Sequence, residues 1–330
     1  MGLIAATLAA GCFWMNRAIQ PANPDATPFY LRIDRTRPLA SVLADLDRQG
    51  VIRSYRAARI SALIVRARTR LPVGTYRISA AMDTMAVLIA LDNPIHQMVR
   101  LPETNWAART ANLLAKKDVC SADDYVKAVH SPSDFAAALP FPVAAPSLEG
   151  YLFPDTYDLP PLIGATAVVE RQLRAFVRKV YEQLGRPRDI QRIVTVASLI
   201  ELEVNRDEER PLVASVIENR LRKHMMLQID ASINYGLGVW RPLRLSDYRK
   251  TKGPYNLYRH AGLPPGPICS PSLKSIEAAV KPAKTEYLYY VALPDGHSLF
   301  AKTLAEHKKN IAKRMAALAK RAKARGEVHP

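Results

Sequence analysis

Cysteine is scarce in this chain, and the few cysteines follow no pattern. Cys12, Cys120 and Cys269 are the three present in 330 residues. They define neither a disulfide framework nor a metal-ligand spacing. The histidines include no His-Glu-x-x-His pair, and a Gly-x-Ser-x-Gly elbow, a phosphate loop and a dinucleotide fingerprint are also missing. These absences argue against metal, serine-hydrolase and nucleotide chemistry and direct attention to carboxylates. We expect no metal site and no cofactor.

Acidic residues are outnumbered by basic ones. The 30 Asp and Glu residues face 47 Lys and Arg residues, which gives a net charge of +17. Part of the excess lies in residues 306–330, a predicted basic helical tail. The sequence contains no helix-turn-helix, zinc-finger or basic-aromatic signature, so we predict no nucleic-acid partner. The tail is either a solvated helix face or a contact to anionic lipid or an anionic polymer.

One uncharged, mostly apolar segment opens the chain, over residues 1–15. It is shorter than the roughly 20 residues that a membrane-spanning helix needs. We interpret residues 1–20 as a membrane anchor; a cleaved signal peptide, or a lipoprotein whose lipidated residue is Cys12, is the alternative. Residues 21–28 form a proline-containing linker. All three interpretations place the rest of the chain outside the cytoplasm.

The first predicted folded region covers residues 29–101. Its pattern gives a strand, two helices and a second strand, and a further strand follows near residues 97–101. The first strand is predicted at Phe29–Asp34, the two helices at Leu39–Gln49 and Tyr55–Ala67, and the second strand at Val73–Ser79. That order is similar to a small glycan-binding LysM module. We therefore predict an α+β fold: a LysM-like βααβ subdomain, a helical connecting region over 102–145 and a mixed α/β catalytic domain over 146–305.

Two carboxylates close the most apolar helix of the sequence. Residues 193–200 are apolar almost all round, and Glu201 and Glu203 follow them. Residues two apart on a helix point about 200° apart, so the two carboxyls have different roles. Glu201 lies within the buried face and predicts an arginine partner: Arg206, Arg210 or Arg220. Glu203 lies at the margin of that face, where burial and the negative end of the helix dipole would raise its pKa.

Several motifs after residue 147 occur together in a fixed order. They are Leu148–Tyr157, Ala197–Glu203, Ala214–Leu221, Met226–Asp230, Tyr235–Gly236, Pro254–Tyr258, Gly262–Ile268, Pro282–Ala292 and Gly296–His297. In this set the chain resembles the endolytic murein lytic transglycosylases, the MltG/YceG-like family of bacterial cell-wall lyases. The resemblance covers about half of the chain and is far more specific than any one motif.

The resemblance implies a reaction and its setting. The enzyme would cut the MurNAc–GlcNAc bond of nascent peptidoglycan without water and leave 1,6-anhydro-MurNAc ends. One carboxyl suffices, because the muramic acid's own hydroxyl is the nucleophile. The resemblance further implies a single-pass inner-membrane protein whose catalytic domain faces the periplasm or cell envelope, association with cell-wall synthases and an effect on glycan strand length.

The resemblance also assigns residues. Glu203 matches the family's catalytic Glu, which acts as general acid and then as base. The expected substrate contacts are Gln228, Asp230, Tyr255, Asn256 and Tyr151, with Tyr258 as a further stacking surface. The expected supporting residues are Glu201, Glu149 and Arg220. The chain departs from the family pattern at Leu202, where Lys is usual, and at Ala231, where Pro is usual.

Three other functions stay open from the residues alone. A hydrolytic glycosidase would pair Glu203 with Asp230 or Glu149. A non-catalytic peptidoglycan-binding scaffold would rely on the LysM-like subdomain. Without the surrounding motifs, Glu203 itself would be a surface carboxylate at the helix end, paired with Arg206. A basic nucleic-acid binder is the weakest alternative. Residues 294–297 additionally predict a β-hairpin turn, with His297 as a structural donor.

Overall fold

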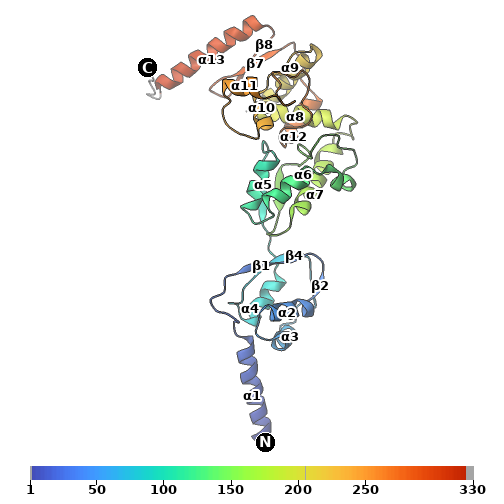
Figure 1. The fold of residues 1–330 in the computed structure, drawn as a ribbon, viewed down its shortest axis with the longest axis vertical. Coiled ribbons are helices and arrows are strands. Elements are labelled where there is room, and N and C mark those ends of the chain that lie inside the picture. Colours follow the sequence, from blue (N-terminus) through green and yellow to red (C-terminus); the bar gives the residue numbers. More distant parts are fainter. Residues whose placement is uncertain (1, 205, 325–330) are drawn as a thin grey trace. The chain divides into compact units, whose positions relative to one another are not determined.

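The computed structural model describes residues 2–204 and 206–324 (Figure 1). The chain divides into two compact units. The first comprises residues 1–99, 114–121 and 157–165, and the second comprises residues 100–113, 122–156 and 166–330. Helices and short two-stranded sheets build both units, so the predicted α+β class is confirmed.

The first unit is organised by one antiparallel strand pair. Strand β1 (Phe29–Ile33) pairs with β4 (Gly74–Ile78), and helices α2 (Leu39–Arg48) and α3 (Tyr55–Ile64) lie between them in the sequence. The predicted order of strand, helix, helix and strand is confirmed. The smaller elements of this unit are β2 (Arg37–Pro38), which pairs with β3 (Arg70–Leu71), and α4 (Thr84–Asp92).

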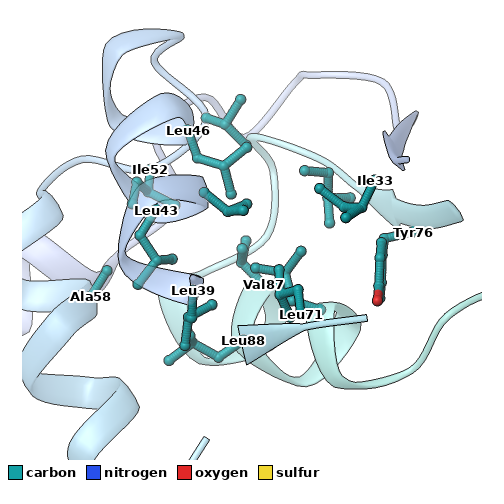
Figure 2. Packing of buried hydrophobic residues seen from close by; sticks show 14 residues of the cluster. Ile33, Leu39, Leu43, Leu46, Ile52, Ala58, Leu71, Tyr76, Val87 and Leu88 are labelled. Atoms are coloured by element: carbon teal, nitrogen blue, oxygen red, sulfur yellow. The ribbon is translucent and has the colours of Figure 1, made fainter. Parts of the chain in front are cut away.

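Apolar spacing along α2 explains the core of this unit. Leu39, Val42, Leu43 and Leu46 are all buried, at the i, i+3, i+4 and i+7 spacing that puts side chains on one helix face. Figure 2 shows this face turned toward side chains from the strands and from α4, with Tyr76 at the edge of the cluster. The core is built mainly from aliphatic side chains, and the hydroxyl of Tyr76 donates to Pro72 O at 2.9 Å.

The chain begins with helix α1 (Gly2–Ile19). Among the helices of residues 2–204 and 206–324, none is both long enough and apolar enough to cross a membrane. Cys12 lies exposed on α1, with a free thiol. The anchor, signal-peptide and lipidation interpretations of this segment stay predictions.

The boundary between the units differs from the predicted domain limits. Residues 114–121 and 157–165 belong to the first unit, although the sequence placed them in the connecting region and the catalytic domain. Backbone pairing over long sequence distances holds them there: Leu159 N–H donates to Gln97 O at 2.8 Å, and Leu162 N–H donates to Asp118 O at 2.8 Å. Local apolar patterns carry no information about such pairing. Strands β5 (Met98–Leu101) and β6 (Asp155–Asp158) pair near these segments.

The second unit is mainly helical. Its first helices are α5 (Ala107–Ala115), α6 (Ala122–Val129), the 3₁₀ helix η1 (Pro132–Ala138), α7 (Ala165–Phe176) and the π-helical turn η2 (Val177–Tyr181). The remaining helices are α8 (Ile190–Glu203), the 3₁₀ turn η3 (Asp207–Glu209), α9 (Arg210–Arg222), α10 (Asp230–Leu237), α11 (Leu245–Lys250), α12 (Leu273–Val280) and α13 (Leu304–Ala324). Helix α8 packs against both α9 and α12, which explains why it is apolar almost all round.

A β-hairpin follows these helices. Strand β7 (Tyr289–Ala292) pairs antiparallel with β8 (Ser298–Ala301), which confirms the hairpin predicted around residues 294–297. Gly296 takes a left-handed conformation with φ +90°, which glycine adopts without steric cost. Helix α13 packs on both strands (Figure 1). The predicted helical tail is therefore helical through residue 324, and its last residues lie outside the described part of the chain.

Candidate active site

Glu203 is the last residue of α8, as predicted, and its side chain is half-buried. The Tyr290 hydroxyl, on β7, donates a hydrogen bond to Glu203 Oε2 at 2.9 Å. Burial raises the pKa of Glu203 to about 7, and the nearby negative charge of Asp230 adds to this rise. The Tyr290 hydrogen bond and the Arg220 charge pull the pKa in the other direction. Near neutral pH the carboxyl is thus close to half-protonated, as a general acid–base requires.

Arg220 holds the backbone around this carboxyl. Its Nε donates to Leu288 O at 2.7 Å, and its Nη1 donates to Leu227 O at 2.8 Å. The guanidinium also lies 5.2 Å from the centre of the Tyr289 ring. Burial lowers the pKa of Arg220. This arginine therefore joins the start of β7 to the segment before α10, in agreement with the supporting role predicted for it.

Asp230 begins α10 and is held by two tyrosines. The Tyr248 hydroxyl donates to Asp230 Oδ2 at 3.0 Å, and the Tyr258 hydroxyl donates to Oδ1 at 2.7 Å. The two rings meet edge to face, 4.9 Å between centroids. Burial, followed by the hydrogen bond to Asp230, raises the pKa of Tyr248 to about 12 and also raises that of Tyr258. Both phenols therefore stay protonated as donors at neutral pH.

Gln228 has an exposed side chain on a strained backbone. Its φ is +54°, in the left-handed region that residues other than glycine seldom occupy. Its N–H donates to Leu257 O at 3.0 Å, which fixes this conformation. Strain of this kind is often found at functional sites. The exposed amide stands two residues before Asp230, and its contact to substrate stays a prediction.

Glu201 is structural, as its buried position predicted. Its Oε2 accepts hydrogen bonds from Arg210 Nη1 at 3.1 Å, from Ser272 N–H at 2.9 Å and from Ser272 Oγ at 2.6 Å. The predicted arginine partner is therefore Arg210. These bonds tie the end of α8 to the starts of α9 and α12. Arg206 instead donates to Asp295 O at 3.3 Å, so it serves the hairpin turn and is not the partner considered for Glu203.

Two predicted sugar contacts are wrong, because both side chains are fully buried. Tyr151 is 0% exposed and packs edge to face on Phe176, 5.4 Å between centroids. Asn256 is also 0% exposed, and its Nδ2 donates to Tyr248 O at 3.0 Å and to Thr251 O at 2.8 Å. Asn256 therefore shapes the loop that presents Tyr248 and Tyr258. Both residues are of types that often contact sugars, but here Tyr151 packs in the core and Asn256 binds backbone carbonyls.

Tyr255 and Glu149 lie together at a separate cavity of the second unit, whose lining does not include Glu203. The Glu149 Oε2 accepts a hydrogen bond from Ala107 N–H at 2.8 Å. Burial raises the pKa of Glu149 to about 7. Among the described residues, Glu149 and Glu203 are therefore two carboxyls whose pKa is raised to about 7 in different surroundings.

Sequence reasoning missed Tyr290 and Tyr248. Tyr290 lies in the predicted strand of residues 287–293, and only its contact with Glu203, 87 positions earlier, reveals its part in the site. Tyr248 belongs to α11, a short helix that the patterns did not predict. A signal was present in both places: tyrosines cluster at residues 248, 255, 258, 287, 289 and 290.

Fold and site together define an α+β protein whose half-buried Glu203 carboxyl accepts a hydrogen bond from Tyr290, and whose exposed Asp230 is held by two further tyrosines. The chain belongs to the YceG-like family, whose model matches residues 31–313.

Two curated relatives each match about half of this chain. An endolytic murein transglycosylase of Bacillus subtilis is 38% identical over 167 residues, 49% of this chain and 46% of that protein. An endolytic murein transglycosylase of Streptococcus pneumoniae is 33% identical over 175 residues, 50% of this chain and 32% of that protein. The chain thus matches less than half the length of these curated relatives. A crystal structure of a yceG-like protein from Listeria monocytogenes is similar with TM-score 0.57 and 27% identity, covering 86% of this chain and 99% of that one.

Proposed function

We propose that this protein is an endolytic peptidoglycan lytic transglycosylase. The single observation that carries the proposal is the half-buried Glu203 carboxyl, whose pKa is raised to about 7 while Tyr290 holds its Oε2. The relatives named as endolytic murein transglycosylases support the choice of substrate.

The proposed reaction needs one carboxyl. Protonated Glu203 gives its proton to the oxygen of the MurNAc–GlcNAc bond, and the bond to C1 breaks. The carboxylate then takes the proton of the muramic acid 6-hydroxyl as that oxygen closes on C1. The proton returned to Glu203 restores the acid form, and the strand carries a 1,6-anhydro end. Tyr290 orients the carboxyl by holding one oxygen, so that the other oxygen faces the substrate.

Asp230 and Gln228 would bind the sugar next to the bond that breaks. Asp230 is exposed at the start of α10 and is fixed by two phenols, and Gln228 presents an exposed amide two residues earlier. A carboxylate suits sugar hydroxyls, and an amide suits both hydroxyl and acetamide groups.

The location and the partners belong to the same proposal. We infer a single-pass inner-membrane protein that faces the periplasm or cell envelope, binds nascent strands with a LysM-like first unit and works beside cell-wall synthases. The uncharged residues 1–15 and the βααβ order of the first unit support this inference. Protease added to intact spheroplasts should then digest the second unit, and protection of that unit would contradict the inference.

The experiment is a digestion of purified sacculi followed by mass analysis of the products. The protein should release 1,6-anhydro ends, and Glu203→Gln should reduce that release at least ~100-fold, since acid–base catalysis contributes at least that factor. Glu208→Gln is the matched control, because Glu208 is an exposed carboxylate close to the site in sequence. Reducing ends in place of anhydro ends would identify a hydrolase. Undiminished release by Glu203→Gln would refute the assignment of the acid.

A further inference from the structure

A cavity of about 340 Å³ lies beside Glu149, apart from the Glu203 carboxyl. Its wall includes Trp106, Tyr235 and Tyr255, with Ala108 among the residues that line it. Ligand pockets begin near this volume and combine apolar or aromatic walls with a few polar groups.

Aromatic rings form one side of the cavity. Trp106 meets Tyr235 edge to face, 5.9 Å between centroids, and Tyr235 lies 4.9 Å from Tyr255. Trp240 extends the cluster, 5.4 Å from Trp106 between ring centroids, and the residue is 47% exposed. Rings that pack mainly on one another present edges and faces of low polarity, which suit the C–H faces of a pyranose.

Glu149 supplies a polar group that the protein leaves partly unused. The side chain is 2% exposed, and Oε2 accepts from Ala107 N–H. Within residues 2–204 and 206–324, Oε1 is buried and has no hydrogen-bond partner. An unpartnered buried oxygen destabilises the fold, because the oxygen loses its hydration and gains no hydrogen bond in return. A ligand that hydrogen-bonds to Oε1 would offset this loss.

The backbone holds Glu149 firmly in place. Gly150 has φ +84°, and a Cβ at this position would lie 2.5 Å from Pro267 and 2.7 Å from Val194. Leu148 N–H donates to Val129 O at 2.8 Å on the other side. Only glycine permits this close approach, so the turn fixes the direction of the Glu149 side chain.

The cavity and the Glu203 site share structural elements. Helix α10 carries Asp230 at its start and Tyr235 near its end, and a helix rises about 1.5 Å per residue, so the two positions are roughly 8 Å apart along the axis. The loop after α11 likewise carries Tyr258 to Asp230 and Tyr255 to the cavity. One glycan strand is long enough to reach both places.

We propose that this cavity is a second carbohydrate subsite, which binds one N-acetylated sugar unit of a glycan strand on its aromatic wall and through Glu149 Oε1. The choice of a sugar as ligand rests on the proposed function. The subsite holds the strand at a fixed distance from Glu203 and so strengthens the binding of oligomers over that of a single sugar.

The test blocks the cavity from its exposed rim. Ala108 is exposed on α5 and lines the cavity, so Ala108→Trp fills the entrance without altering the core. Asn112→Trp is the matched control, one turn further along the same helix and outside the lining. Both changes are made in the Glu203→Gln background, which removes turnover. Calorimetric titration with an N-acetylglucosamine tetramer and with the monomer measures binding.

Ala108→Trp should weaken tetramer binding at least tenfold, whereas Asn112→Trp should bind like its parent. Glu149→Leu should weaken binding in the same way, with circular dichroism as the check on folding. Equal binding by Ala108→Trp and the control, or no binding of the tetramer to the parent, would overturn the subsite.

The subsite and the proposed reaction fail separately. With an active Glu203, Ala108→Trp should lower the rate of sacculus digestion while the products remain 1,6-anhydro ends. Loss of anhydro products from the unmodified protein would refute the reaction, and the calorimetric comparison would still decide the cavity.

Discussion

The two compact units bury different kinds of side chain. In the described part of the first unit, the buried polar residues are Ser61, Thr75, Ser79 and Thr84, none of which carries a charge. The second unit, over the residues that the structure describes, buries five residues of charged type: Glu149, Glu201, Glu209, Arg210 and Arg220. A buried charge is expensive unless it is paired and hydrogen-bonded. The core of the first unit therefore serves packing alone. In the second unit, the free energy lost by desolvating charged groups is consistent with a catalytic or positioning role for these groups.

The strongest test of this contrast breaks the buried ion pair. Arg210→Met leaves the Glu201 carboxylate without its arginine and should destabilise the second unit by about 3–5 kcal/mol. Glu201→Gln combined with Arg210→Met should recover much of this loss, because neither charge then remains. Urea unfolding measures both. Arg192→Met removes a more exposed pair with Glu218 and serves as control, with an expected cost of at most about 1 kcal/mol. If Arg210→Met lowered the free energy of unfolding no more than the control does, the buried charges of the second unit would have no special energetic role.

The next test uses pH. The pKa of Glu149 is about 7 in the folded protein against an ordinary value of 4.5, so the folded state binds this proton more tightly than the unfolded state. The resulting stabilisation is complete below pH 4.5 and is lost as the pH rises through 7, at roughly 1.4 kcal/mol per pH unit. Glu149→Gln should flatten this fall for the second unit. Thermal unfolding of the parent and the variant at pH 5 and pH 7 measures this loss of stability. An equal loss in both proteins would show that a group other than Glu149 causes it.

The smallest expected effect is a shift of the pH–activity profile. The proposed acid must be protonated, so activity declines above the pKa of Glu203. Tyr290→Phe removes a hydrogen bond that lowers this pKa, and Asp230→Asn removes a charge that raises it. The decline should therefore move to higher pH in the first variant and to lower pH in the second, each by on the order of one unit. Tyr287→Phe, next to β7, should leave it in place. Shifts in the same direction would refute the electrostatic account.

The sequence predicted the parts of the site that depend on one helix. The apolar run of α8 and the 200° between its two acids separated a buried Glu201 from a half-buried Glu203, and the list of arginines for Glu201 contained Arg210. The hairpin followed from its turn residues, and the βααβ order followed from apolar periodicity.

Contacts between distant segments were beyond the reach of such patterns. Nothing local distinguishes Tyr290, which holds Glu203, from Tyr151, which is core. The Asn256 side chain is of a type that binds sugar acetamides, but in the structure its amide donates to two backbone carbonyls instead. The pairing that assigns residues 157–165 to the first unit likewise depends on hydrogen bonds across long stretches of chain.

The hydrogen bond between Glu203 and Tyr290 joins positions 87 residues apart. During synthesis the Glu203 carboxyl therefore emerges well before the Tyr290 phenol, and contacts of such sequence separation form late because the intervening chain must first be closed into a loop. A nascent chain would contain Glu203 without the Tyr290 hydroxyl that orients its carboxyl. The proposed activity would thus become possible only when the chain through residue 290 has emerged and β7 has folded onto the end of α8.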